Sequence, residues 1–290
     1  MSAAEVRSFL ERHSLRAQRD LGQNFLFDEN LARRLAELAG VEATDTVVEI
    51  GTGLGTLTRA LAARASRVVT LEVDSGLVAA LRGDSLLPDN VELIHADALK
   101  FDLAGLVRTA RPPIRIVANL PYSIAAPILR RLLDLRGSLT DWSVMLQREV
   151  AERLCAAPGR RTYGSLTVLH AVCVDVSPSM QLEPRCFYPV PRVRSTFLTL
   201  RPLDQPLVGE AELAWVERVS RAAFSQRRKT LVNALRGSLE PRPDPGSVER
   251  ILARLGVSPR IRAERLDPGQ MVDLARALAS PSPLPPGSGS

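Results

Sequence analysis

The sequence predicts an α/β fold, in which a doubly wound sheet of about seven strands precedes a small C-terminal all-helical domain. Short apolar, β-branched runs such as 46–50 and 114–118 alternate with segments of helical period, which is typical of a parallel sheet covered by helices. From about Leu203 the spacing becomes helical without strand-like runs, as at Leu213 and Val216. The 290 residues suffice for one large domain and a smaller one.

The formal net charge of +6 is concentrated in one quarter of the chain. Residues 1–190 carry 22 basic and 22 acidic side chains, whereas residues 191–265 carry 15 basic and 8 acidic ones. A GC-rich genome would explain why nearly all cations are arginines, but not why they are segregated. A local basic surface indicates a polyanionic partner, most simply nucleic acid.

Several classes of protein are excluded by composition. No stretch is long and apolar enough to span a membrane, and the N-terminus lacks the apolar centre of a signal peptide, so we expect a soluble, cytoplasmic protein. Cys155, Cys173 and Cys186 are odd in number and widely spaced, and the three histidines form no ligand pattern with them. We therefore expect neither a disulfide framework nor a metal site.

Before the first strand, residues 1–20 are expected to form a short basic arm, helical or loose. Asp28 is a plausible cap for an amphipathic helix through about Leu38. Between these segments, Gln23 and Asn24 stand between a glycine and two apolar residues. They are either turn residues or polar groups that grip a ligand.

The first strand, 46–50, runs into the glycine-rich turn 51–55, and a helix-like segment follows. Such a turn lets the backbone approach a nucleotide-type cofactor closely. The dinucleotide fingerprint requires Gly or Ala at its sixth position, where this chain has Thr56. That residue weakens a nicotinamide or flavin interpretation without excluding it.

Carboxylates follow the next two strands, 68–71 and 91–94. Glu72, at the tip of the second strand, can accept from both hydroxyls of a ribose, in NAD enzymes and in S-adenosylmethionine enzymes alike. Asp97 lies just past the third strand. It either accepts from an adenine amine or caps the next turn.

The fourth strand, 114–118, ends in Asn119-Leu120-Pro121-Tyr122. Open α/β sheets bind ligands at the carboxyl ends of their strands. Asn119 offers a side-chain carbonyl, Leu120 a backbone carbonyl, Pro121 stiffens the turn, and Tyr122 presents a flat face to a base. This chemistry suits an aromatic amine. The alternative is a simple strand-to-helix turn, capped by Asn119, with Tyr122 in the core.

The later segments complete the sheet and the helical domain. We expect a helix over 124–135, a fifth strand over 142–147, and two more strands over 164–174 and 193–200, with a rigid proline-rich loop between those two. Helices are then expected over about 247–255 and 269–279.

The densest cationic run, Arg227-Arg228-Lys229, lies in the helical part. It is either an RNA-binding surface or an ordinary solvated helix face. The expected domains are an arm (1–20), a sheet domain (21–202), a helical domain (203–279) and a disordered tail (280–290).

Taken together, five motifs resemble the rRNA adenine dimethyltransferases, which are S-adenosylmethionine-dependent enzymes of the class I methyltransferase fold. Order and spacing agree over roughly residues 10–279. The motifs are Gly22–Leu26, Glu49–Gly55, Glu72-x-Asp74, Asp97-Ala98 and Asn119–Tyr122.

Three later segments resemble one branch of that family. They are Gln147–Ala151, Phe187–Ser195 and Ala223–Leu231. That branch dimethylates the N6 amine of two adjacent adenosines near the 3′ end of small-subunit rRNA during ribosome assembly. The resemblance implies S-adenosylmethionine as cofactor, rRNA in the assembling 30S subunit as partner, no membrane, no metal, and a monomer.

Three other readings stay open. The nearest rival is a large-subunit (23S) enzyme of the macrolide-resistance type, which resembles this chain much less in its last domain. Another is a non-catalytic rRNA-binding assembly factor. A nicotinamide-dependent oxidoreductase would fit the glycine turn, but it leaves the tetrapeptide and the basic domain unexplained.

The resemblance also implies site roles. Glu72 would bind the ribose and Asp97 the adenine amine of the cofactor. The target adenosine would leave its stack, stack on Tyr122, and donate to Asn119 and to a backbone carbonyl of Leu120 or Pro121. The residues implied around the cofactor are Asn24, Leu26, Gly51, Glu72, Asp97 and Asn119, and the RNA-binding residues are Arg227, Arg228 and Lys229.

Two positions depart from the usual family pattern. Thr52 stands where Pro is common in the glycine turn. Ala125-Ala126 replace the small hydroxyl residues often found before Pro127. Both changes keep small side chains, although a hydroxyl contact to the target nucleotide is lost.

Overall fold

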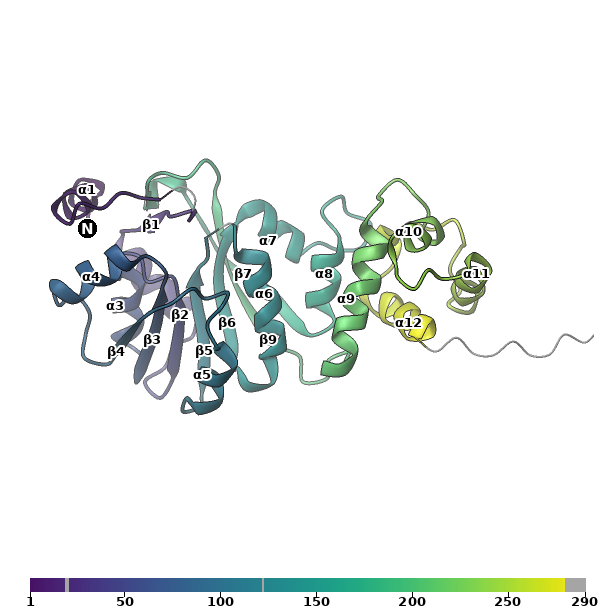
Figure 1. Cartoon of the computed structure of the whole chain (residues 1–290), viewed down its shortest axis with the longest axis horizontal. Coiled ribbons are helices and arrows are strands. Elements are labelled where there is room, and N and C mark those ends of the chain that lie inside the picture. The colour runs from purple at the N-terminus through teal and green to yellow at the C-terminus, as the bar shows by residue number, and fades with distance from the viewer. Residues whose placement is uncertain (19–20, 122, 280–290) are drawn as a thin grey trace, which may run out of the picture. The chain divides into compact units, whose positions relative to one another are not determined.

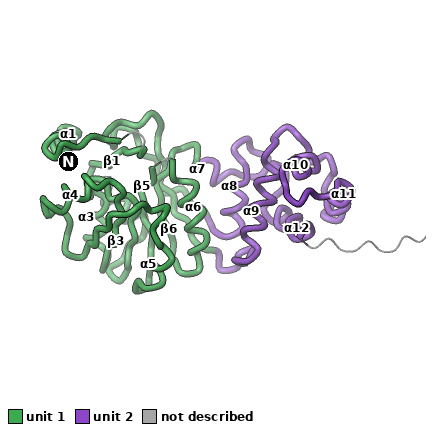
Figure 2. The backbone as a smooth tube through the Cα atoms, in the orientation of Figure 1, with its two compact units in different colours: residues 1–151, 176–202 green, residues 152–175, 203–290 purple. Residues whose placement is uncertain are grey.

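The computed structural model describes residues 1–18, 21–121 and 123–279. They group into two compact units, coloured separately in Figure 2. The first unit contains residues 1–151 and 176–202, and the second contains residues 152–175 and the chain from 203 onward. The chain therefore enters the helical unit twice. The expected boundary between 202 and 203 marks only its last entry and leaves out residues 152–175, which contain the helix Ser165–Ala171.

The first unit is built on a sheet whose described strands follow the order β4-β3-β2-β5-β6-β9-β7 (Figure 1). The strands from β2 to β6 pair in parallel, and β9 pairs antiparallel with β6. This confirms the expected doubly wound sheet. The bounds are β2 (Thr46–Ile50), β3 (Arg67–Glu72), β4 (Val91–His95), β5 (Ile114–Asn119), β6 (Asp141–Gln147), β7 (Val174–Leu182) and β9 (Ser195–Pro202).

Helices connect these strands, and several begin at an aspartate. Asp28, Asp74 and Asp102 each accept a backbone N–H from the first turn of the following helix, which satisfies donors that the helix leaves open. The bounds are α1 (Ala3–Arg12), α2 (Glu29–Leu38), α3 (Thr56–Ala62), α4 (Ser75–Gly83), α5 (Leu103–Thr109), α6 (Ala125–Asp134), η1 (Arg136–Ser138) and α7 (Arg148–Leu154).

The expected basic arm contains the helix α1, which is packed against the first unit. Val6, Phe9 and Leu10 are buried in one apolar cluster with Leu54 and Leu77. These three residues lie on one face because residues three and four apart are neighbours on a helix. The cationic residues of α1, Arg7 and Arg12, are exposed.

The strand predicted over 164–174 is wrong. Residues Ser165–Ala171 form the helix α8, and β7 begins only at Val174. The N–H of Gly164 donates to Thr167 Oγ1 at 3.2 Å, which supports a helix start. A short apolar run fits both a buried strand and a buried helix, so its period alone could not separate them.

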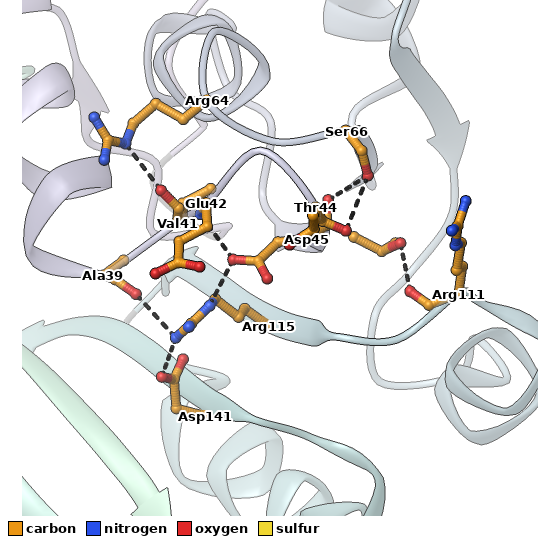
Figure 3. A network of polar contacts seen from close by, with 11 residues as sticks. Ala39, Val41, Glu42, Thr44, Asp45, Arg64, Ser66, Arg111, Arg115 and Asp141 are labelled. Atoms are coloured by element: carbon orange, nitrogen blue, oxygen red, sulfur yellow. Dashed lines mark hydrogen bonds and ion pairs between the residues drawn. The ribbon is translucent and has the colours of Figure 1, made fainter.

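A buried ion-pair cluster joins the amino ends of β2, β5 and β6 (Figure 3). Arg115 on β5 donates from Nε to Asp45 Oδ2 at 2.7 Å and from Nη1 to Asp141 Oδ2. Both aspartates are almost fully buried. The cluster therefore ties the three strands together at their amino ends, opposite the end of the sheet where the parallel strands finish.

The second unit consists of helices, as expected. Tyr163 and Trp215 tie segments together by donating to the backbone carbonyls of Leu266 at 2.9 Å and Ala275 at 2.7 Å. None of the helices in the described chain is long and apolar enough to cross a membrane. The bounds are α8 (Ser165–Ala171), α9 (Glu210–Phe224), α10 (Leu231–Ser238), α11 (Pro245–Arg254), η3 (Ala263–Arg265) and α12 (Pro268–Ala279).

Candidate functional site

The site lies at the carboxyl ends of the parallel strands, at the point in the sheet where the strand order reverses. β2 pairs with β3 on one side and with β5 on the other. The register sets Ile50 beside both Leu71 and Ala118, so Gly51, Glu72 and Asn119 follow at one level. Such a switch point is where open α/β sheets bind ligands.

A cavity of about 240 Å³ lies at these strand ends. Its walls come from the segment 21–26, the glycine turn, the ends of β3, β4 and β5, and Phe187. Tyr122 lies outside the described residues. The other sequence-predicted residues of the first unit all line the cavity: Asn24, Leu26, Gly51, Glu72, Asp97, Asn119, Leu120 and Pro121.

The glycine turn needs glycine for its backbone conformation. Gly51 and Gly53 have φ angles of 87° and 55°, in the left-handed region that side chains disfavour. A Cβ atom on Gly53 would also lie 3.3 Å from Phe25 Cδ1. The turn therefore brings bare backbone to the cavity wall.

Glu72 lines the cavity and also holds the glycine turn. Its two carboxylate oxygens accept separate backbone N–H groups, from Gly53 at 2.8 Å and from Asp74 at 3.0 Å. Burial raises the pKa of this carboxyl group, and the two backbone hydrogen bonds act in the opposite direction. Each oxygen keeps a further lone pair for a ligand hydroxyl.

Asn119 is oriented by a hydrogen bond from a distant part of the chain. Its Nδ2 donates to the backbone carbonyl of Asn24 at 3.2 Å. Only the NH₂ end of an amide can donate, so this bond fixes Oδ1 as the acceptor at the other end. Asn24 is itself held, because its side chain donates to the carbonyl of Gly22 at 3.0 Å.

A backbone hydrogen bond links Pro121 to the residue that precedes α6. The N–H of Ile124 donates to the Pro121 carbonyl at 3.1 Å. The Leu120 side chain is buried, which anchors the turn in the core. Of the two backbone carbonyls considered from the sequence, the one on Pro121 thus already accepts one hydrogen bond and keeps one lone pair.

Asp97 caps a turn, one of the two roles that the sequence suggested, and its adenine contact stays a prediction. Its Oδ1 accepts the N–H of Leu99 at 2.9 Å, which caps the turn after β4. Its Oδ2 lies 3.6 Å from Lys100 Nζ. The carboxylate nevertheless lines the cavity and keeps acceptor capacity.

Gln23 anchors the segment 21–26. Its Nε2 donates to Asp74 Oδ2 at 3.0 Å, and Gln18 Nε2 donates to the same oxygen at 2.9 Å. The other oxygen of Asp74 caps α4 through the N–H groups of Gly76 and Leu77. Asp74 therefore connects this cavity wall to the end of β3.

Phe187 is a cavity residue that sequence reasoning missed. Residues Phe187–Tyr188 form a short strand, β8, which pairs antiparallel with β1 (Phe25–Leu26). This pairing sets Phe187 opposite Leu26, and both line the cavity. Two aromatic residues in an expected proline-rich loop were the available signal.

In the helical unit, the run Arg227-Arg228-Lys229 lies in the loop between α9 and α10, so it is not a helix face. Arg227 has a structural contact, because its guanidinium donates to the carbonyls of Arg161 at 2.6 Å and Tyr163 at 3.4 Å. Arg228 and Lys229 are exposed.

Three basic segments meet around this loop. The N–H of Gly159 donates to the Glu264 carbonyl at 2.6 Å, and the N–H of Leu231 donates to the Ile261 carbonyl at 2.8 Å. The exposed cations on these segments form what we call the basic loop cluster. Its members are Arg160, Arg161, Arg227, Arg228, Lys229, Arg262 and Arg265.

Among the described residues, no group of three His, Cys, Asp or Glu side chains could hold a metal ion.

The chain is similar to known proteins over nearly its whole length. The chain is 39% identical over 281 residues to "Ribosomal RNA small subunit methyltransferase A" of Syntrophus aciditrophicus, covering 94% of this chain and 98% of that protein. A crystal structure of a dimethyladenosine transferase from Plasmodium falciparum has a TM-score of 0.71 at 24% identity, covering 89% of this chain and 97% of that one.

The structure of the 23S rRNA methyltransferase ErmE has a TM-score of 0.63 at 28% identity, covering 88% of this chain and 100% of that one. These likenesses confirm the expected methyltransferase fold. A family model described as "Ribosomal RNA adenine dimethylase" matches residues 14–280. With nearly the whole described chain matched, the protein belongs to the ribosomal RNA adenine dimethylase family.

Proposed function

We propose that the protein transfers methyl groups from S-adenosylmethionine to the N6 amines of two adjacent adenosines near the 3′ end of small-subunit rRNA. The observation that carries this proposal is the orientation of Asn119, whose amide is held by the Asn24 carbonyl so that Oδ1 is the available acceptor beside the cavity. Membership of the family supports the adenine chemistry.

The residues around the cavity fit the cofactor. Glu72 would accept from the ribose hydroxyls, and Asp97 would accept from the adenine amine. Gly51 would let the backbone approach, while Leu26 and Phe187 supply apolar wall. When bound, S-adenosylmethionine supplies an electrophilic methyl group on a sulfonium.

Two acceptors would activate the target amine. Its lone pair is delocalised into the adenine ring, which makes it a poor nucleophile. Asn119 Oδ1 and the Leu120 carbonyl would accept its two hydrogens and favour a pyramidal nitrogen, a geometry needed only in the transition state. The Pro121 carbonyl shares its oxygen with the Ile124 N–H and keeps one lone pair, so Leu120 is the preferred second acceptor and Pro121 the alternative.

Proton removal needs no dedicated base, because the amine proton becomes acidic only as the new bond forms. For the second transfer, the pocket must accept a monomethylated amine with one hydrogen left. Stacking of the target base on Tyr122 is proposed from the tetrapeptide sequence alone.

The relatives' names favour the small subunit over the large one. The curated relative named for the small subunit is 39% identical to this chain, whereas the 23S enzyme is 28% identical. The complete tetrapeptide argues against a non-catalytic assembly factor. We further propose that the protein acts in the cytoplasm, as a monomer, on the assembling 30S subunit, with the basic loop cluster on rRNA.

Labelled methyl transfer tests the function directly. Unmethylated 30S and 50S subunits are incubated with the protein and labelled cofactor, and the nucleosides are analysed. We expect dimethyladenosine in the small subunit only. Asn119→Ala should lower the transfer rate far more than cofactor affinity, since its main contribution belongs to the transition state. Label in the large subunit, or an Asn119→Ala variant with the wild-type rate, would contradict the proposal.

A further inference from the structure

A second cavity, of about 430 Å³, lies in the helical unit, and we call it the Trp215 pocket. It is formed by α9, α11, α12 and the loop before α11. Apolar side chains and exposed arginines both contribute to its lining. The members that matter here are Trp215, Leu239, Ile251, Arg242, Arg250 and Arg254.

Trp215 presents a fixed, partly exposed aromatic surface. Its Nε1 already donates to the Ala275 carbonyl at 2.7 Å, so the indole has no donor left for a ligand. The Arg218 guanidinium carbon lies 5.2 Å from the ring centroid, in cation–π geometry. An indole held in this way offers a flat apolar surface, on which a nucleobase can stack.

Positive charge surrounds this surface. Arg250 and Arg254 are four residues apart on α11 and so lie on one face of the helix. Among the residues that the structure describes, Arg254 has no hydrogen-bond or ion-pair partner. Arg250 donates to Ser247 Oγ at 2.8 Å, and Arg242 pairs with Glu240 at 3.2 Å.

One carboxylate lines the described part of the pocket, and it is largely engaged. Asp244 caps α11 by accepting the N–H of Ser247 at 2.8 Å. Its distance to Arg250 Nη2 is 3.9 Å, at the limit of an ion pair. The pocket therefore keeps an excess of positive charge beside an apolar surface.

We propose that the Trp215 pocket binds one unstacked nucleotide of RNA, with its base against Trp215 and its flanking phosphates on Arg250 and Arg254. The inference rests on the proposed function, which makes RNA the partner. Charge complementarity selects this occupant, because an uncharged peptide would fill the apolar part and leave the arginines without a role. Stacking plus backbone charge is how single strands are held without sequence preference.

The pocket is separate from the basic loop cluster. Trp215 precedes Ser225, where the loop begins, by about ten residues on α9, which is roughly 15 Å along a helix axis. A second contact at that distance would extend the grip on RNA by a few nucleotides.

Tryptophan fluorescence provides the test. The full chain is titrated with a single-stranded hexa-adenylate at several salt concentrations. Trp142 is fully buried and serves as a constant background, so quenching reports on Trp215. We expect quenching by the oligonucleotide, with an affinity that falls as salt rises.

Arg250→Gln/Arg254→Gln is the test variant, because both side chains are exposed and their loss leaves the helix packing intact. Two fewer phosphate contacts should lower the slope of log affinity against log salt by about 1.4, which is about 25-fold in affinity at 0.1 M salt. Arg33→Gln/Arg34→Gln, exposed on α2, removes the same charge outside the pocket and should change affinity little.

Three outcomes would overturn the inference. They are no quenching of the wild-type protein, equal affinity of the test and control variants, or quenching by an uncharged apolar peptide but not by the oligonucleotide. Methyl transfer to 30S subunits by the same preparation separates the two proposals. A protein that methylates rRNA without quenching loses this inference alone, and one that is quenched but transfers no methyl group loses the proposed function alone.

Discussion

At the residue scale, a network of buried polar side chains connects the glycine turn to the strands β2 and β3. Glu49 is fully buried, and its Oε2 accepts the hydroxyls of Thr58 and Thr70, each at 2.6 Å. Thr52 Oγ1 lies 2.7 Å from Thr70 Oγ1. Because Thr70 gives its proton to Glu49, Thr52 must be the donor in that pair. Thr52, which replaces a common proline, is thus fixed by hydrogen bonding.

Glu49 should make stability depend on pH. Burial raises its pKa to about 8. Between its ordinary pKa and about pH 8 the folded state keeps a proton that the unfolded state has lost, so stability falls by about 1.4 kcal/mol per pH unit. Glu49→Gln mimics the protonated form, and it should flatten this slope. Urea unfolding from pH 5 to 8 measures how the free energy of unfolding changes with pH. Equal slopes for the variant and the wild type would contradict a raised pKa for Glu49.

Glu72→Ala should weaken cofactor binding. The variant would lose the charged hydrogen bond that we assign to the ribose, worth about 1.5–3 kcal/mol, which corresponds to roughly ten- to a hundredfold in affinity. It also releases the N–H of Gly53, so the glycine turn loosens. Calorimetry with S-adenosylmethionine gives the affinity, and a thermal melt checks the fold. Asp89→Asn, exposed and outside the cavity, is the control; unchanged affinity in Glu72→Ala would place the ribose elsewhere.

The types and order of residues were sufficient to identify the candidate site, but not the direction in which the Asn119 amide points. Glycines after a strand, and carboxylates at the tips of the next two, mark a nucleotide-type edge in any doubly wound sheet. The direction of the Asn119 amide depends on the Asn24 carbonyl, which is remote in sequence. A contact of that kind has no local signal.

At the element scale, local pattern predicted the parallel strands well because their apolar runs are bounded by glycine, proline and caps. It failed where an apolar run was short, as at α8. It also missed β8, because two residues carry no period, and their pairing with β1 is set by tertiary structure.

Arg115 should be a major contributor to the stability of the sheet. Arg115→Met would leave Asp45 and Asp141 buried without their cation, and breaking such a buried pair costs about 3–5 kcal/mol. Arg111→Met, an exposed neighbour before the same strand, should change the free energy of unfolding by about 0.5 kcal/mol or less. Denaturant unfolding compares the two.

The adjacent aspartates supply the complementary test. Adding Asp45→Asn and Asp141→Asn to Arg115→Met removes the uncompensated charges, so it should recover part of the lost stability. If the single and triple variants unfolded at the same denaturant concentration, the loss would come from packing and not from buried charge.

At the scale of the whole molecule, composition located the basic domain, but it could not show that the chain enters this domain twice. The segment 152–175 precedes the last strands of the sheet in sequence, yet it packs with the helices that follow them. Its Arg160 and Arg161 therefore belong to the basic loop cluster, although a division of the chain at residue 202 assigns them to the sheet domain.

All three cations of the run 227–229 are exposed, but only Arg227 also has structural hydrogen bonds. Arg228→Glu/Lys229→Glu should weaken binding to 30S subunits and lower the salt slope by about 1.8, because two phosphate contacts are lost. Arg227 is left in place, since its contacts to Arg161 and Tyr163 hold the loop. Cofactor affinity should not change, because the cavity that we assign to the cofactor is lined by residues of the first unit alone.

Binding to 30S particles at several salt concentrations measures the affinity and its salt slope in one experiment. Arg33→Glu/Arg34→Glu on α2 reverses the same charge outside the basic loop cluster, so any general effect of net charge appears in that variant too. A larger loss of affinity and a flatter slope in the 228/229 variant would assign rRNA backbone contacts to the loop. If the two variants shared one slope, the excess positive charge of the helical unit would act only as a long-range field.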